Sequence, residues 1–227
     1  MGHSRGVQMQ QLSIVIPVYN DAPALAQLLP QLPAAAEVIV VDGGSDDLRG
    51  RCWPDNVQWL HTSAPDRGAQ LSAGIKASRH PWLWLLHADS SVDASTVAQL
   101  EALHEPGWGR FDVEIQSARL DLRLVAGLMN WRSRWTGICT GDQGIFVHQA
   151  VLRAAGGMPS QPLMEDIELT RRLRRLSAPR CLPGKLRTSA RRWEQHGVLR
   201  TVFAMWWLRL RYWVGASPER LAARYYS

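Results

Sequence analysis

Apolar and polar residues follow one another along the first half of the chain in short blocks that predict strands and helices in alternation. Leu12–Val18 is a largely β-branched apolar run, which is typical of a buried strand. Further strands are expected at 37–41, Val57–His61 and 82–87, and helices at 22–32, 68–79 and 93–104. Asp21 is the expected N-cap of the first helix, and Asp93 or Ser95 that of the third. This alternation predicts an α/β fold with a mostly parallel sheet flanked by helices.

The second half of the chain is less regular. Residues 112–124 alternate in polarity and are interpreted as strands, and a short strand is expected at 144–147. Helices are expected at 149–155, 165–176 and 191–214. The expected organisation is therefore a disordered N-terminal tail (1–11), an α/β domain (12–188), and a Trp- and Arg-rich C-terminal helical extension (189–227).

Composition limits the class of protein. The chain has 227 residues, of which 46% are apolar and 20% charged, so one globular domain with an appendage is expected. The three cysteines lie far apart and fit neither a disulfide framework nor a CxxC metal site, which favours a reducing compartment. Residues 1–11 lack the apolar segment of a signal peptide, and no run of about 18 apolar residues exists. We therefore expect a cytoplasmic protein.

Charge is concentrated at the C-terminal end. Residues 171–227 hold 14 basic and 2 acidic side chains, although the whole chain has a net charge of only +6. Such a segment favours an anionic partner, which is a phosphate group, a nucleic acid or an anionic membrane face. The alternative is a solvated arginine-rich helix face.

A stretch within this segment, residues 201–214, combines Trp and Tyr with Arg209 and Arg211. It is too short to span a bilayer, but aromatic and basic side chains favour the membrane interface. We therefore expect peripheral attachment to the inner face of the plasma membrane. The alternative is that the tryptophans pack this helix onto the core.

Candidate binding groups follow three of the predicted strands. They are Asn20-Asp21, Asp42-Gly43-Gly44 and His87-Ala88-Asp89. Ligands bind at the carboxyl ends of parallel strands, so these groups predict a site at one sheet edge. Asp42 is suited to a base or ribose, unless it only caps a turn. A lone carboxylate such as Asp89, together with diphosphate oxygens, is a common way to hold Mg²⁺ or Mn²⁺, whereas His87 is interpreted as a core histidine.

Two helix starts complete the candidate site. Arg67-Gly68 opens the helix at 68–79, where backbone N–H groups and an arginine favour phosphate, although a surface arginine is an equal alternative. Glu165-Asp166 follows the Gly- and Pro-rich residues 156–162, which suits Asp166 as a general base. The alternative is that both acids only complement the helix dipole.

Together these motifs resemble a known family. Ile14–Asn20, Val40–Asp46, Arg67-Gly68, Asp89 and Glu165-Asp166 occur in the order and approximate spacing of family-2 glycosyltransferases. The resemblance covers residues 12–176 and implies a GT-A fold with a Rossmann-like sheet, so that 12–188 would be the catalytic domain. A closer resemblance is to a small bacterial subgroup often found near radical-SAM/selenoprotein-type genes. It rests on residues 86–89, 140–144, 162–168 and 188–193.

The resemblance implies a role for each motif. Asp166 would be the catalytic base with Glu165 beside it, and Asp89 would bind Mn²⁺ or Mg²⁺. His87 replaces the first acid of the family's DxD motif, so another residue would assist the metal, with His196 as a candidate. The residues implied to bind the donor nucleotide are Pro17, Tyr19, Asn20, Asp42, Gly43, Arg67, Gly68, His87 and Asp89. Those implied to bind sugar or acceptor are Gly141, Asp142, Gln143, Arg192 and Trp193.

The implied activity is metal-dependent, inverting transfer of a single sugar from a nucleotide-diphosphate sugar, with UDP favoured, to a small-molecule or lipid-linked hydroxyl acceptor. Processive synthases of this family carry QxxRW and membrane helices, whereas Ser189 stands at the Gln position here. One alternative is a nucleotidyltransferase-like enzyme, which would need a basic Gly-rich loop where Tyr19-Asn20-Asp21 stands. A second is a non-catalytic sugar-nucleotide or membrane-binding module. Nucleic acid is the least favoured partner, because the C-terminal aromatics follow helical spacing.

Overall fold

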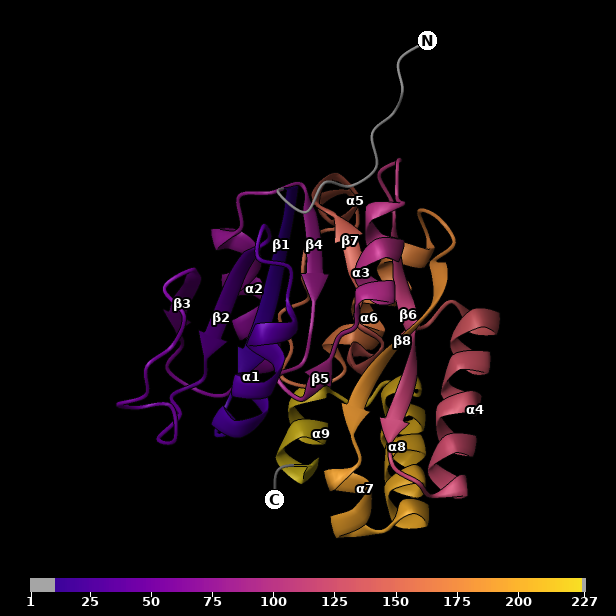
Figure 1. Ribbon diagram of the computed structural model, residues 1–227. Coiled ribbons are helices and arrows are strands. Elements are labelled where there is room, and N and C mark those ends of the chain that lie inside the picture. Colours follow the sequence, from indigo (N-terminus) through magenta and orange to yellow (C-terminus); the bar gives the residue numbers. More distant parts are fainter. Residues whose placement is uncertain (1–10, 226–227) are drawn as a thin grey trace.

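The computed structural model describes residues 11–225, apart from the side chains of Arg192 and His196. Its centre is an eight-stranded sheet with the order β3-β2-β1-β4-β7-β6-β8-β5 (Figure 1). The strands are β1 (Leu12–Val18), β2 (Glu37–Asp42), β3 (Val57–His61), β4 (Trp82–Leu85), β5 (Ser90–Ser91), β6 (Trp108–Gln116), β7 (Phe146–His148) and β8 (Arg180–Ser189). Only β7 and β5 run against the others in this sheet. The predicted mostly parallel α/β fold is confirmed.

Helices cover both faces of the sheet (Figure 1). Ile14 and Ile16 of β1 pack in one core cluster with residues of α1 and α3, whereas Val15 packs in a second with residues of α2, α5 and α6. Side chains of β1 therefore alternate between two cores, as expected for a buried parallel strand. The helices are α1 (Ala22–Leu28), α2 (Arg67–Ala77), α3 (Ala94–Glu101), α4 (Leu120–Thr136), α5 (Gln149–Ala154), α6 (Glu165–Arg174), α7 (Arg191–His196), α8 (Val198–Trp213) and α9 (Pro218–Tyr225), with short 3₁₀ turns η2 (Leu29–Gln31) and η3 (Gly141–Gln143).

The prediction of strands at 112–124 was wrong beyond Gln116, because α4 begins at Leu120. The segment Leu120-Asp-Leu-Arg-Leu alternates like a strand, but Leu122 and Ala126 are one helical turn apart and pack against β6. The strand β8 was not predicted. It contains Pro183-Gly184, and its register with β6 shifts between Phe111 and Asp112.

The C-terminal helix predicted at 191–214 is broken into α7 and α8. Gly197 separates them with a φ of 81°, in the left-handed region that glycine adopts without strain. The helix α9 beyond them was not predicted. The predicted disordered tail at 1–11 lies, apart from Gln11, outside the described residues.

Two further expectations concern the cysteines and membrane-spanning helices. Cys52, Cys139 and Cys181 are all free thiols, which agrees with the predicted absence of a disulfide framework. Between residues 11 and 225, no helix is both long enough and apolar enough to cross a bilayer.

Candidate active site at the carboxyl edge of the sheet

The carboxyl ends of β1 and β2 are joined by a side chain of α2. Gln70 is buried, and its Nε2 donates to the carbonyl oxygens of Val18 at 2.9 Å and Val41 at 2.7 Å. The backbone N–H of Gly43 also donates to Val18 O, at 2.9 Å. A Cβ on Gly43 would lie 2.8 Å from Cα of Pro65, so glycine is needed for this close approach. The loops that follow β1 and β2 are thereby held beside the start of α2.

Asn20 and Asp42, two predicted nucleotide-binding residues, meet around Ser45. The Asp42 carboxylate accepts hydrogen bonds from the Ser45 backbone N–H at 2.9 Å and hydroxyl at 2.6 Å. Asn20 adopts a φ of 48°, and its backbone N–H donates to Ser45 Oγ at 2.8 Å. Tyr19 is 49% exposed beside them, whereas Pro17 lies within β1. Asp42 therefore shapes this loop in addition to any contact with a ligand.

Four segments converge through Arg67 and His87. Arg67 Nε lies 3.2 Å from Oε1 of Glu165, and its guanidinium contacts Nε2 of His87. His87 Nδ1 lies 3.2 Å from Asp142 and 3.9 Å from Asp89. His87 is therefore part of a polar cluster rather than the core histidine that we expected. The structure brings the start of α2, the end of β4, η3 and the start of α6 into one site.

Glycines make this convergence sterically feasible. A Cβ on Gly141 would collide with the guanidinium of Arg67 and the ring of His87. A Cβ on Gly68 would collide with the carbonyl oxygen of Gln161, in the loop that leads to α6. Gly68 and Gly141, both predicted site residues, are therefore needed for the close packing of the polar cluster.

Burial perturbs two carboxyl groups in the site. Burial raises the pKa of Asp89 to about 6, with the nearby carboxylates of Asp142 and Asp21 adding to the effect and Arg191 opposing it. Burial also raises the pKa of Glu165 to about 7, against the attraction of Arg67. Such shifts are typical of functional sites.

Asp166 is held by two backbone donors at the start of α6. Its Oδ2 accepts from the N–H of Gly141 at 2.8 Å, and its Oδ1 accepts from the N–H of Ile167 at 2.7 Å. The preceding Met164 adopts a φ of 63°, which is costly for a side chain without a local polar contact. The chain thus turns sharply to place Asp166 against η3.

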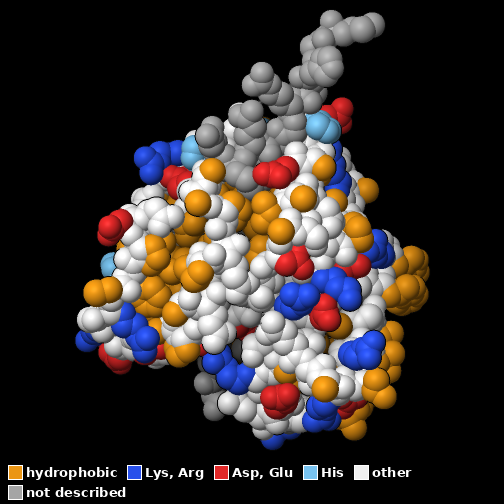
Figure 2. All heavy atoms as spheres, viewed as in Figure 1, with side chains coloured by type: hydrophobic (Ala, Val, Ile, Leu, Met, Phe, Trp, Pro, Cys, Tyr) orange, Lys and Arg blue, Asp and Glu red, His pale blue; other side chains and the backbone are white. Residues whose placement is uncertain are grey.

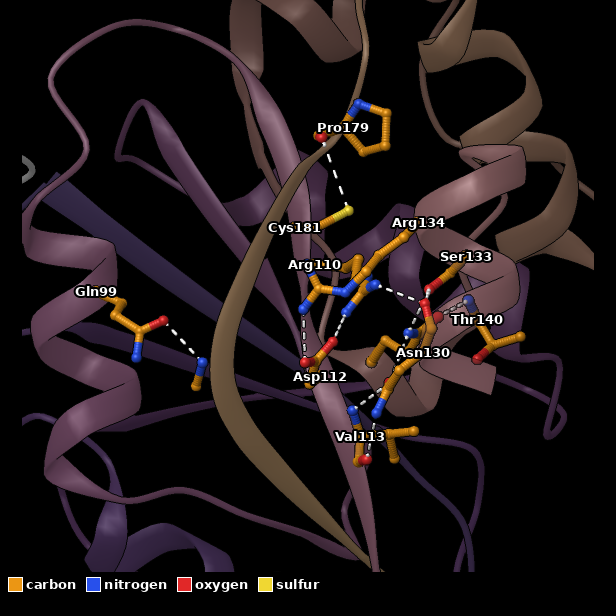
Figure 3. A network of polar contacts seen from close by, with 12 residues as sticks. Gln99, Arg110, Asp112, Val113, Asn130, Ser133, Arg134, Thr140, Pro179 and Cys181 are labelled. Carbon is orange, nitrogen blue, oxygen red and sulfur yellow. Dashed lines mark hydrogen bonds and ion pairs between the residues drawn. The ribbon is translucent and has the colours of Figure 1, made fainter. Parts of the chain in front are cut away.

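A polar network between β6 and α4 holds the turn η3 in place (Figure 3). Gln143 Nε2 donates to Ser133 Oγ at 2.9 Å. Asn130 pairs with both backbone groups of Val113, at 2.8 and 3.0 Å. The guanidinium of Arg110, which is fully buried, contacts Asp112 and donates to Asn130 O at 3.0 Å. Gln143 therefore positions the turn rather than lining an open pocket.

Three arginines lie around this site that were not predicted to belong to it; one of them, Arg209, was wrongly expected at a membrane interface. Arg191 of α7 donates to both carboxylate oxygens of Asp21, at 3.0 and 2.6 Å, which ties the C-terminal segment to the loop after β1. Arg132 of α4 and Arg209 of α8 are largely buried, and both are attracted electrostatically by Asp166. Nε and Nη2 of Arg132 are buried without a hydrogen-bond partner. The high arginine content of the C-terminal segment hinted at Arg191 and Arg209, whereas no signal in the sequence pointed to Arg132.

Other expected site residues lie outside the polar cluster or have side chains outside the described residues. Trp193 packs beside Val113 and Ala190 in the cluster between β6 and α4. The side chains of Arg192 and His196 lie outside the described residues, so their predicted roles stay predictions. The carboxylate of Asp21, although at the N-cap position, bonds Arg191 and makes no capping bond; Asp47 instead accepts from the N–H of Ala22 at 2.8 Å.

The oxygen donors in the site fit a hard divalent cation. Asp89 and Asp142 both approach Nδ1 of His87, and the carboxylate of Asp142 helps to raise the pKa of Asp89. No cluster of three or more His, Cys, Asp or Glu side chains with metal-binding geometry occurs in the described part of the chain. A cation here would need additional oxygens from its ligand, as Mg²⁺ and Mn²⁺ commonly take from phosphates.

The comparisons with known proteins indicate one class of protein, the glycosyltransferases. The model for glycosyl transferase family 2 matches residues 13–108. Glycosyltransferases described as uncharacterized, from Mycobacterium tuberculosis and Mycobacterium bovis, are 29% identical over 136 residues, which cover 54% of this chain and 59% of theirs. The chain thus matches rather more than half the length of these relatives.

Solved glycosyltransferases share the fold. TarS (residues 1–349) of S. aureus, in complex with UDP, has a TM-score of 0.57 and 15% identity, over 79% of this chain and 60% of that one. The mannosyltransferase PcManGT of Pyrobaculum calidifontis, in complex with GDP-Man and Mn²⁺, has a TM-score of 0.56 and 15% identity, over 78% and 56%. The predicted GT-A fold is confirmed, whereas the association with radical-SAM/selenoprotein-type genes stays a prediction.

Proposed function

We propose that this chain is a family-2 glycosyltransferase that transfers one sugar, with inversion, from a nucleotide-diphosphate sugar to a hydroxyl acceptor. The observation that carries the proposal is the pairing of Asp166 with the N–H of Gly141, beside the cluster of His87, Asp89 and Asp142. It brings the Asp166 carboxylate, which would be the base, near the carboxylates of Asp89 and Asp142, which would hold a cation. The family model over residues 13–108 and the glycosyltransferase relatives support the same class.

The donor would lie along the edge formed by β1, β2 and β4. The loop around Asn20, Asp42 and Ser45 offers polar groups for the nucleoside, and Tyr19 offers an exposed ring. Arg67, at the start of α2, would balance phosphate charge. TarS has been solved with UDP and with UDP-GlcNAc, and PcManGT with GDP-Man, which supports a nucleotide sugar without deciding its base.

A divalent cation, Mn²⁺ or Mg²⁺, would be held by Asp89 with help from Asp142. Bound there, it would neutralise the charge that develops on the departing diphosphate. The protein contributes a partly buried carboxylate, and Arg191 lies close enough to favour its ionised form. The Mn²⁺ in the PcManGT complex supports this assignment.

Asp166 would act as the general base. The acceptor oxygen forms a bond to the anomeric carbon while the bond from that carbon to the diphosphate breaks, and the acceptor proton passes to the Asp166 carboxylate. Backbone N–H groups hold the carboxylate in place before the acceptor arrives. Glu165, whose pKa is raised by burial, would position Arg67 rather than touch the acceptor.

The alternative functions have less support. A nucleotidyltransferase would need a basic loop after β1, and Asp21 stands there instead, with its carboxylate bound to Arg191. A non-catalytic module would not require Asp89 and Asp166 to lie around one glycine-lined cluster. A nucleic-acid partner is the least supported, because the exposed tryptophans of the C-terminal segment lie on the helix α8 rather than on a sheet surface.

The proposal includes peripheral attachment to a membrane, where an acceptor would be lipid-linked. It is supported by the basic C-terminal segment, which begins within α6 and includes α8 with its tryptophans. A soluble acceptor is the alternative.

The experiment is a donor-hydrolysis assay with UDP-GlcNAc, UDP-glucose and GDP-mannose, each with Mn²⁺, Mg²⁺ or EDTA. We expect release of nucleoside diphosphate from one donor, dependent on the metal and lost in Asp166→Asn. A thermal-shift series with the same donors measures binding separately, because a bound ligand raises the melting temperature. Binding without turnover in the presence of any metal would leave only the non-catalytic module.

A further inference from the structure

Helix α4 carries an exposed apolar stripe along its whole length. Leu122 and Ala126 face inward against β6, whereas the outward face is formed by large apolar side chains. These are Leu120, Leu124, Leu128, Trp131 and Trp135, which are 55% to 78% exposed. Their spacing of three and four residues puts them on one side of the helix.

Helix α8 carries a second stripe of the same kind. Val198, Thr201 and Leu208 are buried, whereas five large apolar residues point outward at the same helical spacing. These are Leu199, Phe203, Trp206, Leu210 and Trp213, which are 59% to 87% exposed. Soluble proteins rarely expose contiguous apolar areas of this kind without a partner.

The two helices form one surface. Val125 and Met129 of α4 pack in the same cluster as Val198 and Val202 of α8, and the helices lie beside each other in Figure 1. Apolar side chains line the edge of the molecule where α4 lies (Figure 2). We refer to the outward faces of α4 and α8 as the two-helix surface.

Positive charge accompanies this surface. Besides the largely buried Arg209, the segment 198–225 contains four arginines (Arg200, Arg211, Arg220 and Arg224) and one acid, Glu219. The exposed guanidinium of Arg211 lies 5.6 Å from the ring centroid of Trp207. Arg123 of α4 and Arg200 of α8 are also exposed. Exposed tryptophans bordered by arginines match the interface of an anionic bilayer, where rings sit at headgroup depth and guanidinium groups meet phosphates.

The surface adjoins the candidate active site. Leu208 of α8 packs in one cluster with Met164 at the start of α6. The hydroxyl of Tyr212, also in α8, lies 3.2 Å from Glu168 of α6. From α4, Ser133 accepts from Gln143 of the turn that holds Asp166. Both helices therefore have an outer apolar face and an inner face that supports the catalytic turn.

We propose that the two-helix surface of α4 and α8 docks onto an anionic lipid bilayer and thereby presents the catalytic edge to an acceptor at the membrane. The docking names the surface for the peripheral attachment included in the proposed function; only the presentation of the acceptor rests on the proposed transferase activity. A second copy of the chain fits this surface less well, because a symmetric contact would bring its arginines together. No helix needs to enter the bilayer core, since both lie at its interface.

The test is co-sedimentation of the full chain with phosphatidylcholine vesicles, with and without about one-third phosphatidylglycerol. We expect binding only to the anionic vesicles, weakened by salt. The double variants Trp131→Ser/Trp135→Ser and Trp206→Ser/Trp213→Ser should each weaken binding by about tenfold or more, because aromatic insertion is lost. Arg49→Ser/Arg51→Ser, in the exposed loop after β2, removes two positive charges away from the two-helix surface and should bind as the wild type does, which controls for general attraction of a basic protein.

Three results would overturn the docking. They are no binding to anionic vesicles at low salt, wild-type binding by both tryptophan variants, or a dimer in solution that either tryptophan variant dissociates. Donor hydrolysis without vesicles, measured on the same variants, should be unchanged, since none of these tryptophans lies in the catalytic cluster. A protein that binds vesicles but hydrolyses no donor would refute the proposed function and leave the docking intact.

Discussion

The carboxylate of Asp166 accepts a hydrogen bond of 2.8 Å from the backbone N–H of Gly141. This bond joins the start of α6 to η3, and the next residue, Asp142, reaches His87 at 3.2 Å. The proposed base and the proposed cation site are therefore two ends of one short structural unit. Substitutions at the two ends should therefore have different effects. A change at Asp166 should slow the chemical step, whereas a change at the proposed cation site should weaken donor binding.

Asp166→Asn should abolish transfer while leaving donor binding nearly intact. The amide oxygen can still accept the Gly141 N–H, but it cannot take the acceptor proton, and loss of a general base typically costs about 10²–10⁴ in rate. Turnover should be compared with calorimetric binding of the nucleoside diphosphate. Transfer at the wild-type rate would rule out Asp166 as the base.

Asp89→Asn should remove the metal dependence of nucleotide binding. The neutral amide keeps the size of the side chain but loses the charge that a divalent cation requires. Titration of the nucleoside diphosphate with and without Mn²⁺ measures this, with Asp55→Asn as a control because Asp55 is an exposed carboxylate outside the cluster. If Mn²⁺ still strengthens binding to the Asp89 variant as in the wild type, the cation is held elsewhere.

Gly141→Ala should disrupt the cluster from within. Its Cβ would occupy the space of the Arg67 guanidinium and the His87 ring, and such overpacking costs about 1–3 kcal/mol. Both stability in urea and donor hydrolysis should fall. Gly127→Ala is the matched control, because a Cβ there meets nothing within 4 Å and alanine favours the helix by about 0.5–1 kcal/mol. Equal stability of the two variants would contradict the tight packing.

Glu165→Gln should change how stability depends on pH. Burial raises the pKa of Glu165 to about 7 from an ordinary value of 4.5, so the folded protein binds this proton more tightly than the unfolded chain. The wild-type free energy of unfolding should therefore fall, relative to the variant, as pH rises from about 4.5 to 7. Urea unfolding at several pH values measures the difference. Curves that stay parallel across this window would contradict the raised pKa.

Arg191→Gln should weaken donor binding more than it slows turnover. The guanidinium binds both oxygens of Asp21, so its loss frees the loop after β1 without touching Asp166. We expect KM for the donor to rise about threefold to tenfold with little change in kcat, and Arg191→Lys to restore little, because an ammonium cannot make the paired contact. A fall in kcat alone would place Arg191 in the chemical step instead.

The sequence predicted which polar groups lie together at the carboxyl ends of β1, β2 and β4, because the signals for these strands are local. Apolar runs such as Leu12–Val18 end directly in polar groups, and the parallel pairing of β1 with β2 and β4 brings those ends together. Of the two N-caps expected for α3, Asp93 rather than Ser95 takes the position, since it accepts from the N–H of Thr96 at 2.9 Å.

Features that depend on distant contacts were not predicted. Leu120-Asp-Leu-Arg-Leu alternates like a strand, and only packing against β6 decides that α4 is a helix. Nothing near Arg191 in the sequence indicates Asp21, which lies 170 residues earlier. The positions of Arg132 and Arg209 likewise follow from how α4 and α8 pack around Asp166 and the turn η3, which no local pattern encodes.

The strand order has a consequence for how the chain is made. The strands β1, β2, β3 and β4 pair among themselves, so this half of the sheet can assemble as soon as residues 12–85 have left the ribosome. The other neighbour of β4 is β7, which is synthesised roughly 60 residues later. Until then Trp82–Leu85 is an open edge rich in tryptophan and leucine, the kind of edge that pairs with other chains. We expect the nascent protein to be most prone to aggregation, and most in need of a chaperone, during that interval.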